Sequence, residues 1–478
     1  MEISRSTIIK SLLWKYLEKF GVQGVSFVVS VLLARLIAPS EFGLIAIVMI
    51  LVELSNVVVD GGFNSALIQK KEPKNQDFST ILYVSILASL LLYAILYVAA
   101  PHIADFYHED RLAAVLRVLC IVLLFKAFNS VQSAFISKNM LFKKSFVCNF
   151  VAVLISGIVG VALAYMGWGI WALVAQQLLS QIAVCLIMWY YVRWRPSLIF
   201  SKESLKELFD FGWKIFLTNI IVAIFKNVRG LVIGRLFNAS SLAFFERGKH
   251  FPALIVDNLS STIQAILFPV FSNKQDDVVA VKSMLRRSIK TSSLFVFPSM
   301  IGFIVVAKPV IVLLLTDQWL PAVPFVQIFC IAYLLMPIQS ANQQVIISLG
   351  RSDLVLKLEI IKKIVELLIL IISFMYDSIA VAWGIVLYNF ICLFINLYPN
   401  RQLVNYSYYE QFKDLVPIVS VSIIMGIVML GCSFINLPLI FVLCVQIIMG
   451  ILSYIVLNIV FKVEAFTFLI KIIRKNKR

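Results

Sequence analysis

The sequence predicts an all-α, polytopic membrane protein with about fourteen transmembrane helices. Its residues are 61% hydrophobic and 14% charged, whereas a soluble domain has roughly 25% charged residues. Apolar stretches of the length that crosses a bilayer, about 20 residues, recur along the whole chain. None of them alternates with the two-residue period of a transmembrane β-strand. Lipid must therefore solvate much of this apolar surface.

An internal repeat predicts how these helices are organised. VLLARLIAPSEFG from Val31 is echoed by VIGRLFNASSLA from Val232, and LCIVLLFKAFNSVQSAFIS from Leu119 by FCIAYLLMPIQSANQQVII from Phe329. Repeated lobes around a midplane site are typical of secondary transporters, because the two lobes can rock against each other. We expect two six-helix lobes around a central cavity. They would comprise residues 1–200 and 201–410, and residues 411–478 would add two helices and a basic tail.

The expected spans follow the apolar stretches in order. All are interpreted as helices, since only helices and closed barrels satisfy the backbone polar groups in lipid. The last two spans lie outside the repeat and, being apolar throughout, could offer a groove for a lipid tail. The spans cover residues 14–38, 42–68, 79–100, 112–136, 145–166, 168–192, 213–235, 241–271, 288–308, 319–348, 354–376, 378–399, 414–435 and 437–461.

The basic residues between the spans predict the orientation. Lys and Arg gather in alternate loops, whereas the intervening loops contain only Arg35, Arg111 and Arg235. Cytoplasmic loops carry such an excess of basic residues, so both termini are expected in the cytoplasm of a cell with this protein in its inner membrane. This pattern accounts for the net charge of +17 without a nucleic-acid partner. The segment KESLKELFDF, in the long internal loop Arg193–Lys214, is amphipathic and is expected at the inner interface.

No signal for catalysis, a metal or a cofactor is found in the sequence. The seven cysteines lie in apolar segments without a CxxC pair, and the three histidines lack metal-ligand spacing. There is no P-loop, GxSxG or HExxH motif. We therefore expect no enzyme activity, and the first apolar run is too long for the core of a signal peptide.

Polar residues inside the expected spans mark a candidate site. Charges within a membrane are costly and normally face a bundle interior or a water-filled cavity. Here they recur at helical spacing on repeat-related spans, so a cavity bounded by these spans is expected. The candidate substrate contacts are Lys226, Arg229, Lys126, Asn56, Asn64, Asn129, Gln339 and Gln343.

Two interpretations of these residues stay open. The Asn and Gln side chains either bind substrate or join neighbouring helices by hydrogen bonds. The carboxylates either couple transport to an ion or balance the cations; they are Glu53, Asp60 and Asp257. In the span 354–376, ion pairs are expected at four-residue spacing, Glu359 with Lys363 and Lys362 with Glu366.

Five segments resemble the polysaccharide flippases (Wzx-like) of the MOP superfamily. The resemblance covers about residues 10–400 and is most marked for the branch that includes colanic acid and lipopolysaccharide exporters. It implies two six-helix lobes around a central cavity. It differs at one point, where the branch usually has an acidic residue after a basic-Asn pair, and this chain has Arg229 after Lys226-Asn227. The segments are LLARLIAPSEFGLIAI (32–47), DGGFNSALIQKK (60–71), MGWGIWALVAQQL (166–178), IGRLFNASSLAFFERG (233–248) and DQWLPAVPFVQI (317–328).

The hypothesis from this resemblance is a flippase that moves a polyprenyl-diphosphate-linked oligosaccharide across the inner membrane by alternating access. The oligosaccharide would be an O-antigen, capsule or exopolysaccharide unit, and the expected partners are membrane lipid, a polysaccharide polymerase and glycosyltransferases. One alternative is a cation-coupled multidrug exporter of the same superfamily, which would use a membrane carboxylate. The other is a non-transporting scaffold for glycan-assembly enzymes.

Overall fold

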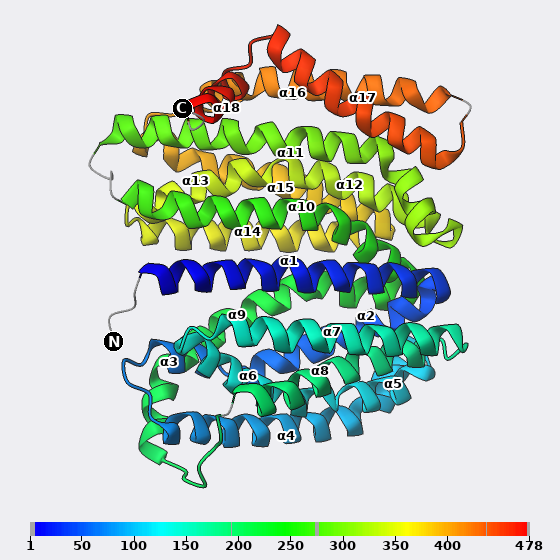
Figure 1. The fold of residues 1–478 in the computed structure, drawn as a ribbon, viewed down its shortest axis with the longest axis vertical. Helices are drawn as coiled ribbons and strands as arrows, with labels where there is room; N and C mark the ends of the chain where they lie inside the picture. The colour runs from blue at the N-terminus through cyan, green and yellow to red at the C-terminus, as the bar shows by residue number, and fades with distance from the viewer. Residues whose placement is uncertain (1–4, 193, 273–276, 436, 476–478) are drawn as a thin grey trace. The chain divides into compact units, whose positions relative to one another are not determined.

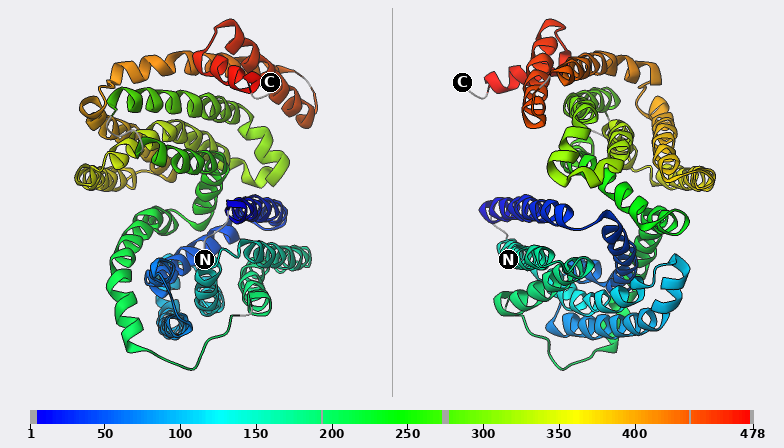
Figure 2. Two further views of the ribbon diagram at one scale, coloured as in Figure 1. Left: turned by 60° about the vertical axis from the view of Figure 1, so that its left-hand side comes forward. Right: turned by 90° about the vertical axis from the view of Figure 1, so that its right-hand side faces the viewer.

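The computed structural model describes residues 5–192, 194–272, 277–435 and 437–475 (Figure 1). Within these ranges the chain consists of helices joined by turns and short coil segments, and no strand occurs. The all-α prediction is therefore confirmed. Figure 2 shows the longest coil that these ranges contain, the stretch that follows α8 and leads into α9.

The helices of the first half are long, apart from the short helices α3 and α5. They are α1 (Arg5–Leu36), α2 (Pro39–Asp60), α3 (Phe63–Gln69), α4 (Asn75–Tyr107), α5 (Arg111–Leu119), α6 (Val122–Lys138), α7 (Phe142–Tyr165), α8 (Ile170–Val192) and α9 (Lys202–Leu236).

The second half contains α10 to α15 and then three further α-helices, α16 to α18. They are α10 (Ala239–Ser272), α11 (Val278–Leu315), the 3-10 helix η1 (Asp317–Ala322), α12 (Val323–Leu334), α13 (Met336–Ser348), α14 (Ser352–Ser373), α15 (Ser378–Leu403), α16 (Tyr408–Gly431), the 3-10 helix η2 (Cys432–Phe434), α17 (Leu439–Val460) and α18 (Glu464–Lys475).

The number of membrane spans comes out slightly below the expected fourteen. Among the described residues, 12 segments are long and apolar enough to cross a membrane. The other two expected spans, 241–271 and 354–376, are helical as α10 and α14. Both contain several charged residues within their length, which lowers their hydropathy.

Three of the expected spans are broken within their length. The span 42–68 is interrupted at Gly61 and Gly62, which adopt φ angles of 52° and 73°. Glycine enters this left-handed region without the steric cost that a Cβ atom brings, so the helix ends here. The span 319–348 comprises η1, α12 and α13, and Pro337 lies in the first turn of α13. The span 112–136 divides between α5 and α6.

The chain divides into two compact units, unit 1 (Met1–Ala243) and unit 2 (Phe244–Arg478). In unit 1, α7 packs on α1 and α8, α6 packs on α4 and α8, and α9 packs on α2, α3 and α4. In unit 2, α13 packs on α11 and α15, α14 packs on α15, and α16 and α17 pack on α11 (Figure 1). The contacts of α6 with α4 and α8 thus recur in unit 2 as those of α13 with α11 and α15.

The first sequence repeat corresponds to the same local structure in both places. α1 ends at Leu36 with Arg35 in its last turn, and α9 ends at Leu236 with Arg235 in its last turn. After each, the chain restarts a helix within three residues, at Pro39 and at Ala239. A cation in the last turn of a helix stabilises the partial negative charge of the exposed carbonyl groups there.

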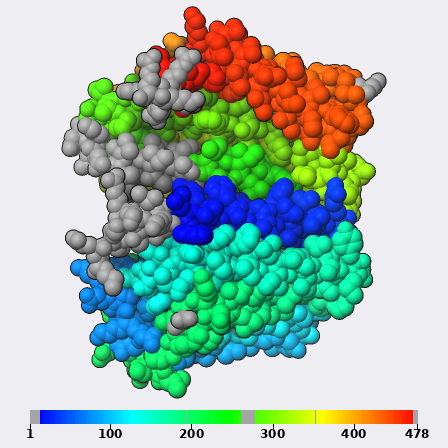
Figure 3. All heavy atoms as spheres, in the orientation of Figure 1, coloured from blue at the N-terminus to red at the C-terminus, as the bar shows by residue number. Residues whose placement is uncertain are grey.

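α1 carries many apolar side chains on its surface. It packs on α7, and Leu13, Leu17 and Phe20 are more than half exposed. Figure 3 shows α1 in blue along the surface beside α7. Exposed apolar side chains at this density are unfavourable in water and are typical of a helix that crosses a membrane.

One close helix crossing in unit 1 yields a stability prediction. A Cβ atom at Gly43 would lie 1.7 Å from the backbone oxygen of Ala239, whereas one at Gly24 would meet no atom within 4 Å. Gly43→Ala should therefore destabilise the protein by about 1–3 kcal/mol, because backbone must move apart. Gly24→Ala, the control, should be neutral or stabilising by up to about 1 kcal/mol. The thermal stability of each variant is measured by the loss of its monodisperse gel-filtration peak on heating. Equal midpoints for Gly43→Ala and Gly24→Ala would contradict the packing described.

Candidate functional site

An ion pair joins α2 to α9 within unit 1. Lys226 Nζ lies 2.8 Å from Glu53 Oε1, and the two side chains are 58% and 43% exposed. Both helices are long and apolar enough to span a membrane. Charges exposed in the middle of such helices are costly against lipid, so this pair is expected to face water or a polar ligand.

Glu53 is shared between two lysines. It hydrogen-bonds Lys226 on α9, and it also lies close enough to Lys126 on α6 to interact with it electrostatically. Lys126 is half-buried, and α2 packs on both α6 and α9. These three side chains thus comprise two cations and one anion.

The neighbours of Lys226 on α9 differ in environment. Asn227 is buried, and its side-chain Nδ2 donates to the Ala223 carbonyl of its own helix at 3.0 Å. Arg229 is half-buried one turn further along the helix. Asn56 is half-buried on α2 between Glu53 and Asp60. The expected polar face therefore forms on α2 and α9, with Asn227 turned into the protein.

The two glycines after α2 bring Asp60 and Asn64 to the same hydroxyl group. Ser130 Oγ on α6 donates to Asp60 Oδ1 at 3.0 Å and accepts from Asn64 Nδ2 at 2.5 Å. The left-handed turn at Gly61 and Gly62 lets the chain double back between these two residues. Asp60 is thus held by a hydrogen-bond chain, and no ion pair to it is found among the described residues.

Two amide side chains that the sequence offers as substrate contacts instead join helices. Asn129 Nδ2 on α6 donates to the backbone oxygen and to Oε1 of Gln181 on α8, both at 3.3 Å. Gln339 Nε2 on α13 donates to the backbone oxygen of Asn389 on α15 at 2.8 Å. These amides occupy matching places in the second sequence repeat, so the same helix pair is tied in the same way in each unit. This geometry favours the helix-joining interpretation for both residues.

Gln343 takes part in a charged cluster on unit 2. Its Nε2 donates to Glu359 Oε1 at 3.2 Å, and the same oxygen accepts a hydrogen bond from the buried Lys362. Lys363 pairs with Glu366 at 2.8 Å. The expected pairing at four-residue spacing is wrong: the ion pairs form at three-residue spacing, so each glutamate pairs with the other of the two lysines.

The remaining sequence candidate, Asp257, lies on α10 in unit 2. Its side chain is exposed. The polar residues that follow it on the expected stripe, Ser260 and Gln264, have side chains outside the described part of the chain. The structure therefore brings Glu53, Asp60, Asn64, Lys126 and Lys226 together in unit 1, and it places Asp257 and Gln343 in unit 2.

A membrane carboxylate that the sequence analysis missed lies on α1. Glu18 Oε1 accepts hydrogen bonds from Ser145 Oγ at 2.6 Å and from Asn149 Nδ2 at 2.8 Å, both on α7. The four-residue spacing of Ser145 and Asn149 was the available signal, since it places both on one face of a helix. Nothing in the sequence shows that this face meets α1.

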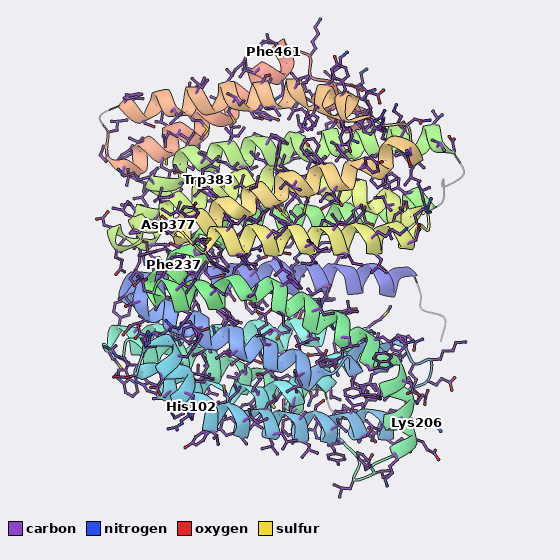
Figure 4. The ribbon with its side chains drawn as sticks, turned by 180° about the vertical axis from the view of Figure 1, so that it is seen from behind. His102, Lys206, Phe237, Asp377, Trp383 and Phe461 are labelled. Carbon is purple, nitrogen blue, oxygen red and sulfur yellow. The ribbon has the colours of Figure 1, made fainter. Side chains whose placement is uncertain are left out.

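An ion-pair triad fixes the amphipathic start of α9 to the turn before α4. Lys70 Nζ lies 2.8 Å from Glu207 and 3.2 Å from the buried Asp77. Burial alone would lower the pKa of Lys70, but its hydrogen bonds to Glu207 and Asp77 outweigh this effect and raise it. Lys206, labelled in Figure 4, marks this part of α9. The segment KESLKELFDF thus forms the first turns of a membrane helix.

Comparison with solved structures defines the class of this fold. The lipid II flippase MurJ in an inward closed conformation is similar with a TM-score of 0.74 at 16% identity, over 94% of this chain and 98% of that one. An inward-facing multidrug resistance MATE family transporter of the MOP superfamily gives 0.61 at 12% identity, over 83% and 98%. The fold of this chain is therefore similar to the folds of these two solved structures.

Sequence comparison then gives the family. Residues 32–324 match the family described as polysaccharide biosynthesis protein, and the chain belongs to it. The lipopolysaccharide biosynthesis protein WzxC of Escherichia coli (strain K12) is 23% identical over 89% of each chain. The teichuronic acid biosynthesis protein TuaB of Bacillus subtilis (strain 168) is 27% identical over 63% of this chain, and the succinoglycan biosynthesis transport protein ExoT of Rhizobium meliloti (strain 1021) is 24% identical over 67%. The match covers 62% of TuaB and 65% of ExoT, less than two thirds of either.

The hydrogen bonds of the Asn129 and Gln339 side-chain amides give a prediction that separates packing from substrate binding. Asn129→Ala and Gln339→Ala should each lower the free energy of unfolding by about 0.6–1.7 kcal/mol, the range for a hydrogen bond between membrane helices. If the protein exports polysaccharide, export at matched protein levels should remain, because the amide nitrogens of Asn129 and Gln339 already donate to a neighbouring helix. Thermal unfolding in detergent measures the first effect and a surface-polysaccharide assay the second. Loss of export at unchanged stability would assign these amides to the substrate.

Proposed function

We propose that this chain is a flippase that turns a polyprenyl-diphosphate-linked oligosaccharide from the inner to the outer leaflet by alternating access. The observation that carries the proposal is the exposed ammonium group of Lys226 on a membrane-spanning helix, held by a carboxylate that also faces Lys126. Membership of a polysaccharide biosynthesis family and a transporter fold support it.

In this proposal, Glu53 pairs with Lys226 while no substrate is bound, and the anionic substrate takes its place. Without substrate, pairing keeps both charges from facing the membrane alone, since an unpaired ion costs several kcal/mol there. A diphosphate carries more charge and more acceptor oxygens than one carboxylate, so it competes for Lys226. Glu53 would then still interact electrostatically with Lys126. The exchange binds substrate without leaving any of the three charges uncompensated.

Other polar residues near Lys226 would contact the sugars and the diphosphate. Asn56 on the same face of α2 is the remaining candidate for sugar hydroxyls, and Arg229 is a second candidate for the diphosphate. The protein would lie in the inner membrane with both termini in the cytoplasm, and polysaccharide polymerase and glycosyltransferases would act before and after it. A multidrug exporter for organic cations fits less well, because Lys126 and Lys226 would repel such substrates.

The central role of Lys226 predicts a sharp loss of transport. A charge-assisted hydrogen bond contributes about 1.5–3 kcal/mol, so Lys226→Ala should reduce export about tenfold to a hundredfold, whereas Lys226→Arg should retain part of it. Lys214→Ala, which removes an exposed lysine from the same helix, is the matched control and should export normally. Surface polysaccharide, measured with the lipid-linked oligosaccharide retained in the cell and with protein level, gives the result.

A substitution of Glu53 tests its role as the partner of Lys226. Glu53→Gln should lower protein yield, because Lys226 and Lys126 then face each other without their shared carboxylate, and Glu53→Gln with Lys226→Ala should recover yield but not export. Normal export by the Lys226→Ala variant would contradict the diphosphate site. If cells with the Lys226→Ala variant accumulate organic cations while their surface polysaccharide is unchanged, the multidrug exporter would be favoured instead.

The orientation makes an independent prediction. Cysteines introduced at Lys71, Lys143 and Arg286 should be protected from a membrane-impermeant thiol reagent in intact cells, since these positions belong to the basic loops. Cysteines at His108 and Asp317 should react. The native cysteines lie in apolar segments, and a variant without them gives the background. Reaction at Lys143 together with protection at His108 would invert the orientation.

A further inference from the structure

A second polar pocket lies in unit 2, apart from the residues discussed so far. It has a volume of about 560 Å³ and is formed by the first turns of α11, the start of α16 and the turn between α17 and α18. Phe461, labelled in Figure 4, lines it at that turn. Basic side chains outnumber acidic ones on its walls. The cations are Lys282, Arg286, Lys290, Lys413 and Lys462, and the acids are Glu410, Asp414 and Glu464.

The acid at the centre of this pocket is fully engaged by its neighbours. Arg286 donates from Nε and Nη2 to the two oxygens of Asp414, both at 2.7 Å. Lys290 lies 2.9 Å from the same carboxylate, and the Tyr406 hydroxyl donates to it at 2.7 Å. Such a bidentate pair with further donors is a stable arrangement, which fixes α16 against α11.

The other two acids are engaged in the same way. Lys290 donates to Glu464 at 2.6 Å, and Lys282 lies 3.1 Å from Glu410. The hydrogen bond from Lys290 is the main cause of the lowered pKa of Glu464, so this carboxylate stays ionised at neutral pH. Each acid of the pocket is thus paired with a cation of its inner wall.

The surplus positive charge is left on two lysines at the rim. Lys413 and Lys462 are exposed, and within the described residues neither has an acidic partner. The ammonium of Lys413 lies 6.0 Å from the centre of the Tyr409 ring. Both lysines line the pocket together with Arg286 and Lys290.

The backbone of Lys462 gives a second, independent observation. Its φ angle is 47°, in the left-handed region. It follows the last turn of α17, and the amide of Val463 donates back to the Asn458 carbonyl at 3.1 Å. Glycine is the usual residue at this position after a helix, because a Cβ atom is strained there. A lysine that occupies it despite the strain indicates that its side chain is used.

The surroundings place the pocket at the level of lipid headgroups. α11, α16 and α17 are membrane-spanning, and the pocket lies where α11 and α16 begin and α17 ends. α18 follows directly; its Ala465 is buried, and Phe466 and Leu469 pack on the same core, while Lys471 is exposed. A helix of this kind lies in the interface, with its basic side chains toward the headgroups.

We propose that this pocket binds the phosphate group of an anionic glycerophospholipid, with Lys413 and Lys462 as its contacts. The lipid is a bound ligand at this place and not the transported substrate, so the site is independent of the proposed flippase activity. The charged side chains of the pocket suit a phosphate group, and α18 beside it would hold the glycerol end at the interface. Such binding would stabilise unit 2 in membranes that contain negatively charged lipid.

The full-length protein in detergent allows a direct test. Dioctanoyl phosphatidylglycerol should raise the midpoint of thermal unfolding in a concentration-dependent way, because a ligand that binds only the folded state stabilises it. Dioctanoyl phosphatidylcholine and inorganic phosphate are the comparison ligands. The variant Lys413→Ala/Lys462→Gly should bind phosphatidylglycerol at least tenfold more weakly. The control Lys357→Ala removes an exposed lysine of α14 outside the pocket and should respond as the wild type does.

The glycine substitution separates binding from folding. Because it relieves the left-handed strain, Lys462→Gly should leave the ligand-free midpoint unchanged or higher, so weaker binding cannot be attributed to a damaged fold. An undiminished response of the double variant would overturn the proposal. An equal response to phosphatidylcholine would overturn it as well, and an equal response to inorganic phosphate would replace the lipid with a free anion.

Discussion

The cost of placing charges in a membrane shapes unit 1. Lys226 on α9 and Lys126 on α6 lie in helices long enough to cross the bilayer, and Glu53 on α2 faces both. An isolated ion there would cost several kcal/mol, so the Glu53–Lys226 pair stabilises the contact between α2 and α9. The same arrangement leaves one more cation than anion. A site that is stable when empty and still attracts an anion is what a carrier of a phosphate-bearing lipid requires.

The repeated helix pairs supply the scaffold around this charge. The amide of Asn129 ties α6 to α8, and the amide of Gln339 ties α13 to α15, each through a backbone carbonyl. These bonds, together with the Asp60–Ser130–Asn64 chain, satisfy polar groups that lipid cannot. Asn64, Asn129 and Gln339, three of the expected polar side chains, therefore bond a neighbouring helix. Lys226 is the exception with the greatest exposure among the described candidate cations.

The sequence predicted the class, the fold family and the places of the helices, because lipid forces long apolar segments and leaves basic residues in the loops. It located Lys226 and Glu53 but not their pairing, since contact between α2 and α9 depends on tertiary packing. The motif DGGFNS shows its glycines plainly, yet only the structure shows that Asp60 and Asn64 converge on Ser130. Glu18 was missed because its partners, Ser145 and Asn149, lie on a distant helix. These three misses concern contacts between helices, which periodicity along one helix does not contain, whereas the error in the α14 ion pairs concerns the choice of partner within one helix.

Reconstituted transport tests the central claim most directly. The purified protein in liposomes would be given two fluorescent lipids with the same sugar and the same polyprenyl chain, one linked through a diphosphate and the other through an uncharged ether. A membrane-impermeant quencher reports how fast each lipid changes leaflet. The account predicts that the protein moves the diphosphate-linked lipid faster than protein-free liposomes do and leaves the uncharged lipid at the background rate. Equal acceleration of both lipids, or of neither, would contradict it.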